Sequence, residues 1–455
     1  MDSNKAPTQS QLSMNSIANV EIKVTKYRWT ILFIIGLVSI MNFMQMLQFS
    51  IIANIITKFY NVESYWVDMT TLIFFLSYIL FFYPVSYLIE KYNLKWTVVV
   101  ATALTLAGSI LKIFAPKSDL FWLILLAQFL IAIGQVQLSS LPSKLATTWF
   151  GCEEVSTACA IVVLGMQLGS GLGCIQSPFL ITGTDNDTIS LELYNMFLYQ
   201  AIATGCIFVL VLIFFRSKPQ LPPSQSQLDL LSNTEVENVS FYTNMKKIVK
   251  EKNFWFIVLS LGLANGVWNS FGVLVNTIYL NYFPDGQSDA GIISLVTIIS
   301  GGCIGSMIFG YLLDKTHEFK KISFAILTLS ALFYFLMSVT LIEKSRIGSF
   351  IVIPFFGFFI APVLIVAFEY LVEVTYPIPE ACSSSIFNAA YFLLSIIVTL
   401  LVELLISAID YLWTFVCIFL TLCLCVMFIL LVDSNLKRRD ANLQHNNSNN
   451  VMSRL

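Results

Sequence analysis

Charged residues are scarce in this chain. They make up 11% of its 455 residues, and 57% of the residues are hydrophobic, whereas a soluble domain carries about 25% charged residues. So few polar side chains do not cover a surface that faces water. The composition therefore excludes a soluble protein and predicts that the lipid bilayer surrounds the chain. We expect no nucleic-acid partner.

Histidine is scarce too, and the cysteines show no recognisable pattern. Both histidines, His317 and His445, lie in polar stretches, and the nine cysteines show neither a disulfide framework nor the paired spacing of a zinc site. No group of His, Asp and Cys is placed for catalysis at membrane depth. We therefore expect no enzyme, no metal site and no cofactor. Residues 1–28 contain no apolar core before a small-residue cleavage site, so no removable signal peptide is predicted.

The sequence has long apolar segments instead. A helix needs about 20 apolar residues to cross a bilayer. Twelve segments meet this need: 29–50, 66–88, 96–114, 120–141, 155–181, 194–215, 254–280, 291–313, 322–341, 347–371, 383–407 and 411–432. The prediction is an all-α integral membrane protein with two pseudo-symmetric six-helix bundles, 29–215 and 254–432. A polar, Pro-containing linker at 216–253 joins them, and disordered ends are expected at 1–28 and 433–455.

The distribution of Lys and Arg predicts the orientation. Positive loops stay in the cytoplasm, and 20 of the 25 basic residues lie in the termini, the linker and the loops on the same side. Both termini are therefore predicted to be cytoplasmic. The five exceptions are Lys58, Lys112, Lys117, Lys344 and Arg346. Asn186, in an Asn-Asp-Thr triplet, then lies outside as a candidate glycosylation acceptor.

The two halves repeat each other. SYLIEKYNLKW at 86–96 follows the second segment, and GYLLDKTHEFKK at 310–321 follows the eighth. TWFGCEEVSTA at 148–158 follows the fourth segment, and TYPIPEACSSS begins 227 positions later. Two matched motifs predict a six-helix repeat about an axis along the membrane normal.

The first motif places an acid before spaced basic residues: Glu90, Lys91 and Lys95 in one half, Asp314 and Lys315 in the other. The duplication favours a resemblance to the major facilitator superfamily over a plain cluster of interfacial charges. The resemblance implies that each acid docks on a helix N-terminus of the opposite half, where free N–H groups and the helix dipole stabilise a carboxylate. We expect Glu90 near Ser383 and Asp314 near Ser156, as gating latches of the cytoplasmic face.

Other polar positions inside the segments are mostly amides. Mid-membrane charge is nearly absent, with Glu403 as the main candidate and Glu369 nearer the cytoplasmic end. Proton-driven carriers usually hold titratable groups in their pathway, so we expect a facilitative uniporter.

Two segments contain residues that depart from a plain apolar run. Gly165, Gly169 and Gly173 recur at intervals of four, which predicts close helix packing, at the helix where the two halves would rock. Trp268 stands mid-segment beside Asn269. It suits a bent helix that lines a cavity, and it also suits a Trp that fills a gap in the core.

Longer stretches narrow the resemblance. They are FMQMLQFSIIANI (43–55), LPSKLATTWFGCEEVSTACAIVVLGMQLG (141–169), FPDGQSDAGIISL (283–295) and FEYLVEVTYPIPEACSS (368–384). Together they resemble the feline leukaemia virus subgroup C receptor family, solute carrier family 49, over about 27–432. The resemblance implies facilitative transport of choline or ethanolamine in a cage of aromatic rings, with export of haem or another amphiphile as the alternative.

The family's site maps onto this chain with substitutions. Its Q-W-I-Q-Y motif is Gln45-Met46-Leu47-Gln48-Phe49 here, so a Met replaces the caging Trp. The predicted substrate-binding residues are Gln45, Met46, Gln48, Phe49, Gln135, Gln167, Trp268, Asn269, Tyr391 and Phe392. Six of them, Met46, Gln167, Trp268, Asn269, Tyr391 and Phe392, are expected to meet near the bilayer midplane. Either Trp268 and Tyr391 rebuild the cage from neighbouring positions, or the substrate differs.

Two function classes remain. A transporter with alternating access needs the matched gating motifs, whereas a receptor or sensor of the same fold does not. We expect a monomer in the plasma membrane that moves a small organic cation. An anion fits poorly, since no Lys or Arg is expected at the depth of the site.

Overall fold

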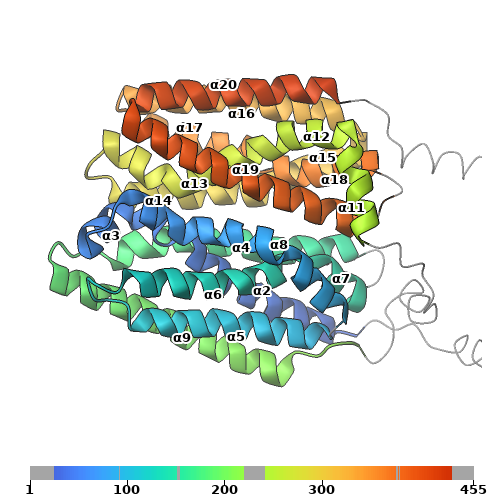
Figure 1. Ribbon diagram of the computed structural model, residues 1–455, viewed down its shortest axis with the longest axis horizontal. Helices are drawn as coiled ribbons and strands as arrows, with labels where there is room; N and C mark the ends of the chain where they lie inside the picture. Colours follow the sequence, from blue (N-terminus) through green and yellow to red (C-terminus); the bar gives the residue numbers. More distant parts are fainter. Residues whose placement is uncertain are drawn as a thin grey trace, which may run out of the picture.

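The computed structural model describes residues 25–91, 93–150, 154–219, 241–375, 378 and 380–432. In these ranges the secondary structure is helical and contains no strand. Twelve helical spans are long and apolar enough to cross a membrane. The predicted fold class is therefore confirmed, and Figure 1 shows the helices packed side by side along one direction.

The first half of the chain supplies six of these spans. Its elements are α2 (Tyr27–Leu47), the 3₁₀ turn η1 (Ser50–Ile52), α3 (Ala53–Tyr60), α4 (Ser64–Lys91), α5 (Leu94–Ile113), α6 (Phe121–Ser139), α7 (Pro142–Trp149), α8 (Val155–Leu180) and α9 (Asn186–Phe214). The first span is longer than expected. It runs for 34 residues, from Tyr27 to Tyr60, because the chain bends after α2 and resumes as α3.

The second half begins inside the predicted linker. Its elements are α11 (Phe241–Lys250), α12 (Lys252–Ile257), the π stretch η2 (Val258–Gly262), α13 (Leu263–Tyr282), α14 (Gln287–Ile298), the π stretch η3 (Ile299–Gly305), α15 (Ser306–Thr316), α16 (Phe319–Ile342), α17 (Arg346–Ile360), α18 (Val363–Thr375), α19 (Glu380–Ala408) and α20 (Tyr411–Leu431). Helix α11 occupies the end of the expected 216–253 linker. The expected disordered ends lie almost wholly outside the described residues.

The surface of the helices is apolar. Large side chains such as Phe33, Ile213, Met307 and Leu401 are more than half exposed. Water does not tolerate such a surface on a monomer, whereas lipid does. The exposed side chains therefore support the membrane environment that the composition predicts.

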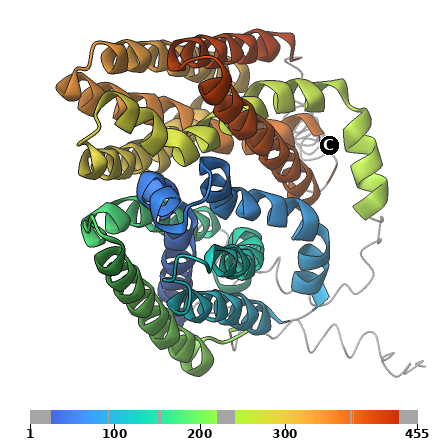
Figure 2. The same ribbon diagram turned by 60° about the vertical axis from the view of Figure 1, so that its left-hand side comes forward.

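The two halves of the chain lie side by side. In Figures 1 and 2 the helices up to α9 occupy one side of the molecule, and those from α12 onward occupy the other. One end of the molecule contains the start of α2, helix α11 and the end of α20. We call it the near end. The opposite end, with the α3–α4 and α13–α14 connections, is the distal end.

A glycine stripe brings α8 against α2. A Cβ on Gly165, Gly169 or Gly173 would meet backbone atoms of Gly36, Ile40 and Met44 in turn. Close helix packing is thus confirmed, as small residues at intervals of four allow. The stripe itself packs within the first half, because both helices belong to it, and rocking of the two halves at this helix stays a prediction. The opposite face of α8 meets the second half, where Leu295 and Ile298 flank Gly171.

Candidate functional site

The bend in the first span positions four of the predicted site residues. Helix α2 ends at Leu47, and its last carbonyl groups need new hydrogen-bond donors. Thr71 Oγ1 of α4 donates to the Met46 carbonyl at 3.0 Å, and Gln128 Nε2 of α6 donates to the Gln45 carbonyl at 2.9 Å. Irregular backbone at membrane depth is tolerated where protein groups satisfy it in this way.

Gln45 faces a buried lysine. Lys112, near the end of α5, is fully buried, and its ammonium donates to Gln45 Oε1 at 2.5 Å and to Gln200 Oε1 at 3.4 Å. The ammonium also lies over two phenyl rings, 5.8 Å from the centroid of Phe49 and 5.5 Å from that of Phe197. Amide oxygens and aromatic faces together are the groups that bind an ammonium ion.

Lys112 corrects two expectations. The charge pattern grouped it with the residues of an outer loop, and the site was expected to have no Lys or Arg at its depth. Side chains of a helix lean toward its N-terminus, so Lys112 reaches back from the end of α5 into the interior of the first half. Gln45 and Phe49 are thus engaged by the chain's own ammonium, and Gln48 accepts a hydrogen bond from Gln200 at 2.6 Å.

Met46 and Gln167 point elsewhere. Gln135 Nε2 lies 3.5 Å from Met46 Sδ, which joins α6 to α2 within the first half. Gln167 of α8 packs on the backbone of η3 in the second half, because a Cβ on Gly302 would lie 2.9 Å from Gln167 Cδ. π stretches are frequent at functional sites, and this one lies at a contact between the halves.

Trp268 and Asn269 lie on α13 in the second half. Trp268 is partly exposed, with its ring stacked on Phe271 at 6.3 Å and tilted against Phe356 at 6.5 Å. Asn269 Nδ2 donates to Ser395 Oγ of α19 at 3.0 Å. These contacts connect α13 to the helix that carries Tyr391 and Phe392.

An aromatic cluster joins the two halves. Phe392 of α19 lies 4.3 Å from Tyr391, 5.2 Å from Phe75 and 4.9 Å from Tyr78, measured between ring centroids. Asn388 Nδ2, one turn earlier on α19, donates to Tyr78 Oη at 3.2 Å. Phe75 and Tyr78 belong to α4 of the first half, and the sequence interpretation did not include them.

The described contacts therefore divide the ten predicted residues into groups. Gln45 and Phe49 contact Lys112 directly, and Gln48 is linked to it through Gln200. The others have different partners: Met46 with Gln135, Gln167, Trp268 with Asn269, and Tyr391 with Phe392. Convergence of the six central residues on one ligand stays a prediction.

A carboxyl pair was also missed. Asp68 lies within α4 and is fully buried, although the sequence interpretation named only Glu403 and Glu369 as charged candidates. The Asp68 and Glu403 carboxyl groups lie within hydrogen-bonding reach of each other, where α4 contacts α19 of the opposite half. A lone acid two residues into a predicted segment gave a usable signal, since such residues are rare and functional in membranes.

Amides close the seam beside this pair at the distal end. Asn276 Nδ2 of α13 donates to Asn54 Oδ1 of α3 at 3.1 Å, and Gln287 Nε2 of α14 donates to Asn276 Oδ1 at 3.2 Å. Gln287 also donates to the Ile51 carbonyl. Side chains from both halves thus contact each other at the distal end.

The repeated loop motifs have matching structural roles. Lys95 Nζ donates to the Leu212 carbonyl at the end of α9 at 3.0 Å. Lys320 Nζ donates to the Leu430 carbonyl at the end of α20 at 2.8 Å and to the Val432 carbonyl at 2.7 Å. A cation at a helix C-terminus satisfies free carbonyl groups and opposes the dipole. In each half a motif lysine therefore ties the motif to the sixth helix of the same half.

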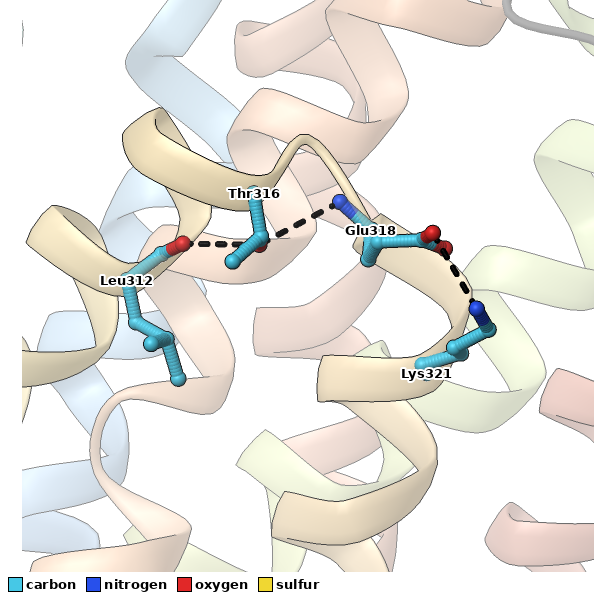
Figure 3. A network of polar contacts seen from close by, with 4 residues as sticks. All are labelled: Leu312, Thr316, Glu318 and Lys321. Carbon is cyan, nitrogen blue, oxygen red and sulfur yellow. Dashed lines mark hydrogen bonds and ion pairs between the residues drawn. The ribbon is translucent and has the colours of Figure 1, made fainter.

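The second copy of the motif also holds its own loop. Thr316 Oγ1 donates to the Leu312 carbonyl at 2.7 Å and accepts from Glu318 N at 3.4 Å, while Lys321 pairs with Glu318 at 3.1 Å (Figure 3). Lys315 beside it is exposed. The side chains of Glu90, Lys91 and Asp314 lie outside the described residues, so the latch contacts stay a prediction.

Two loops at the distal end are organised by carboxylates. Asp185 caps α9 by accepting from Thr188, and this hydrogen bonding lowers the pKa of its carboxyl group. Asn186 follows as an exposed first residue of α9. In the second half, the Arg346 guanidinium donates to Asp285 and holds the pKa of that carboxyl below its ordinary value.

Known proteins match this chain over most of its length. The family model of the Major Facilitator Superfamily matches residues 31–378. The choline/ethanolamine transporter flvcr2b of Danio rerio is 34% identical over 381 residues, which cover 84% of this chain and 78% of that protein. The choline/ethanolamine transporter FLVCR2 of Homo sapiens is 30% identical over 427 residues, 92% of this chain and 80% of that one.

A solved structure shares the fold. A bacterial homolog of the human lysosomal transporter Spinster, in an inward-facing and unoccupied conformation, aligns with a TM-score of 0.71 and 14% identity, over 91% of this chain and 99% of that one. The likeness at this identity concerns the fold alone. With the family match and the relatives, the chain is a multi-pass membrane transporter that belongs to the Major Facilitator Superfamily and, within it, to the feline leukaemia virus subgroup C receptor family.

Proposed function

We propose that this transporter carries a small organic cation of the choline and ethanolamine type by alternating access, without coupling to a second ion. The observation that carries the proposal is the aromatic cluster of Phe75, Tyr78, Tyr391 and Phe392 between the halves. Rings that come from both halves give a quaternary or primary ammonium a face on either side of the seam. The names of the relatives support the same substrate class.

The closed distal seam supports alternating access. We propose that the distal end is the extracellular side and that both termini are cytoplasmic, in the plasma membrane. The amide contacts of Asn54, Asn276 and Gln287 are few and polar, so they can be exchanged for water when the halves tilt. Glu90 and Asp314 would then close the opposite face in the alternate state.

Uptake into proteoliposomes tests the substrate class. Radiolabelled choline and ethanolamine are the probes, and vesicles without protein are the blank. A cation over a Trp face gains about 0.5–2 kcal/mol, so Trp268→Ala should weaken apparent affinity by about 2- to 30-fold, and Trp268→Phe should weaken it less. If Trp268→Ala leaves uptake intact while Gln167→Ala abolishes it, hydrogen bonding rather than an aromatic cage recognises the solute. Absence of saturable uptake of both probes rejects the substrate class.

The coupling mode needs its own experiment. A uniporter equilibrates the electrochemical potential of its solute, so at zero membrane potential a cation reaches equal concentrations on both sides. With the membrane potential held at zero, we therefore expect an inward proton gradient to give no accumulation of choline above the external concentration. Accumulation that follows the gradient and disappears in Glu403→Gln would overturn uniport.

A further inference from the structure

Asp68 is the most unusual side chain at the distal seam. It lies one turn into α4 and is fully buried. Neither of its carboxylate oxygens accepts a hydrogen bond from an N–H or a neutral O–H group in the part of the chain that the structure describes. Buried polar groups nearly always have partners, and an isolated buried carboxylate is costly. The environment of Asp68 therefore requires a special partner.

Glu403 is that partner. It is half-buried on α19 of the opposite half, which packs against α4, and its carboxyl group lies within hydrogen-bonding reach of Asp68. A carboxylate is only an acceptor, so two carboxyl groups form a hydrogen bond when one of them carries a proton. Two carboxylates in the same place repel each other.

Other charged or titratable side chains near this end are engaged or exposed. Lys58 on α3 is exposed, and Tyr60 donates to the Ala115 carbonyl at 2.9 Å. Lys112 of α5 is held by Gln45 and Gln200. Three tyrosines near this end pack against other rings: Tyr65 on Trp66, Tyr279 on Phe283 and Tyr282 on Phe415. Asp410 accepts a hydrogen bond from Tyr411 N. Helix α6, which packs along α4, has no titratable residue.

We propose that Asp68 and Glu403 share a single proton while the distal end is closed, and that release of this proton unlocks the two halves. The O–H bond of the shared carboxyl group breaks, water on the distal side accepts the proton, and two carboxylates remain. Their repulsion adds to the cost of reclosing the seam. This inference rests on the alternating movement in the proposed function and adds a pH-sensitive control to it.

The proton gates the transporter and does not drive it. Because the pair lies in the distal seam, the proton enters from the distal side and returns to it, with no net transfer across the membrane. The closed state binds one proton more than the open state. By linkage, the ratio of open to closed molecules rises with pH, by about tenfold per pH unit at most.

A native cysteine reports on the seam. Cys174 of α8 is fully buried, and a Cβ on Gly291 of α14 would lie 2.9 Å from its carbonyl oxygen. Opening of the distal end separates α8 from α14 and exposes this thiol. The protein purified in detergent is treated with a hydrophilic maleimide between pH 5.5 and 8.5, and peptide mass spectrometry measures the rate at Cys174 alone.

The variants remove the need for a proton. In Asp68→Asn an amide N–H donates to Glu403, and in Glu403→Gln an amide donates to Asp68, so the closed seam survives at any pH. Dividing the wild-type rate by the variant rate at each pH cancels the ionisation of the thiol itself. We expect this ratio to rise about tenfold or more across the range for both variants. The exposed Glu343→Gln should follow the wild type throughout.

The possible outcomes separate the hypotheses. A ratio that stays flat with pH, while Cys174 is measurably labelled, rejects the shared proton. A Cys174 that is unlabelled at every pH rejects opening of the distal end, and with it the proposed alternating access. If one variant does not fold, the other gives the same ratio. Labelling needs no solute, so a failure of choline uptake counts against the substrate class and leaves the carboxyl pair standing.

Discussion

The contact of α2 with α8 predicts a graded response to added methyl groups. A Cβ would approach the opposing carbonyl oxygen to 3.2 Å at Gly165, 2.6 Å at Gly169 and 2.2 Å at Gly173. The opposing atoms are backbone, so no rotamer change relieves the clash. At Gly173 the two helices must separate by about 1 Å to reach the 3.4 Å at which ordinary contact begins.

Two terms set the size of the effect. Replacing a helical Gly by Ala gains up to about 1 kcal/mol from backbone entropy, and forcing an extra group into a tight contact costs about 1–3 kcal/mol. Gly165→Ala should therefore be close to neutral, Gly169→Ala should destabilise, and Gly173→Ala should destabilise most. Gly36→Ala is the matched control in the same interface, because a Cβ there meets nothing within 4 Å.

The assay is thermal unfolding of the four purified variants in one detergent. We expect the Tm values to fall in the order Gly36→Ala and Gly165→Ala, then Gly169→Ala, then Gly173→Ala. Equal Tm values for Gly36→Ala and Gly173→Ala would show that the helices part freely, and the argument from backbone contact would then be wrong.

Further predictions concern the loops. Glu90→Gln or Asp314→Asn should remove a charge–dipole interaction of about 0.3–2 kcal/mol and raise cysteine accessibility of the cytoplasmic cavity; unchanged accessibility in both variants contradicts the latches. Asp285→Asn should lower Tm at neutral pH, because Arg346 depresses the pKa of Asp285. That stabilisation is lost as pH falls below about 3.9, the ordinary Asp value, so the Tm values of wild type and variant should converge in acid. Asn186→Gln should abolish any glycosidase-sensitive shift in gel mobility.

The sequence predicts the fold well, for a physical reason. Each span must satisfy its own backbone in lipid, so a run of apolar residues has one stable structure, a helix. The exception is the first span, where the apolar run continues past Gln48 and α3 extends to Tyr60. The bend depends on Thr71 and Gln128, which lie on other helices, and a local pattern contains no information about them.

The candidate site is harder to predict, since the direction of each side chain depends on tertiary contacts. Gln45 and Met46 are neighbours, yet Gln45 binds Lys112 while Met46 meets Gln135. A family pattern gives the positions of the site residues. It does not give the direction of each side chain once Met46 stands where the family has a Trp. Phe75 and Tyr78 had no polar or charged signal in an apolar segment, so only the packing of α4 against α19 identifies them.

The sequence interpretation misplaced Lys112 and missed Asp68, and both residues matter for a cationic solute. Lys112 places its amine behind α2, between two amide oxygens and two phenyl rings, so these groups are already engaged. Asp68 and Glu403 place acidic groups where α4 contacts α19. In the proposed function, a cation entering from the distal side would be attracted by the two carboxylates of the open seam and would find Gln45 and Phe49 engaged by Lys112. A solute that is held weakly leaves readily, which the proposed facilitative transport requires.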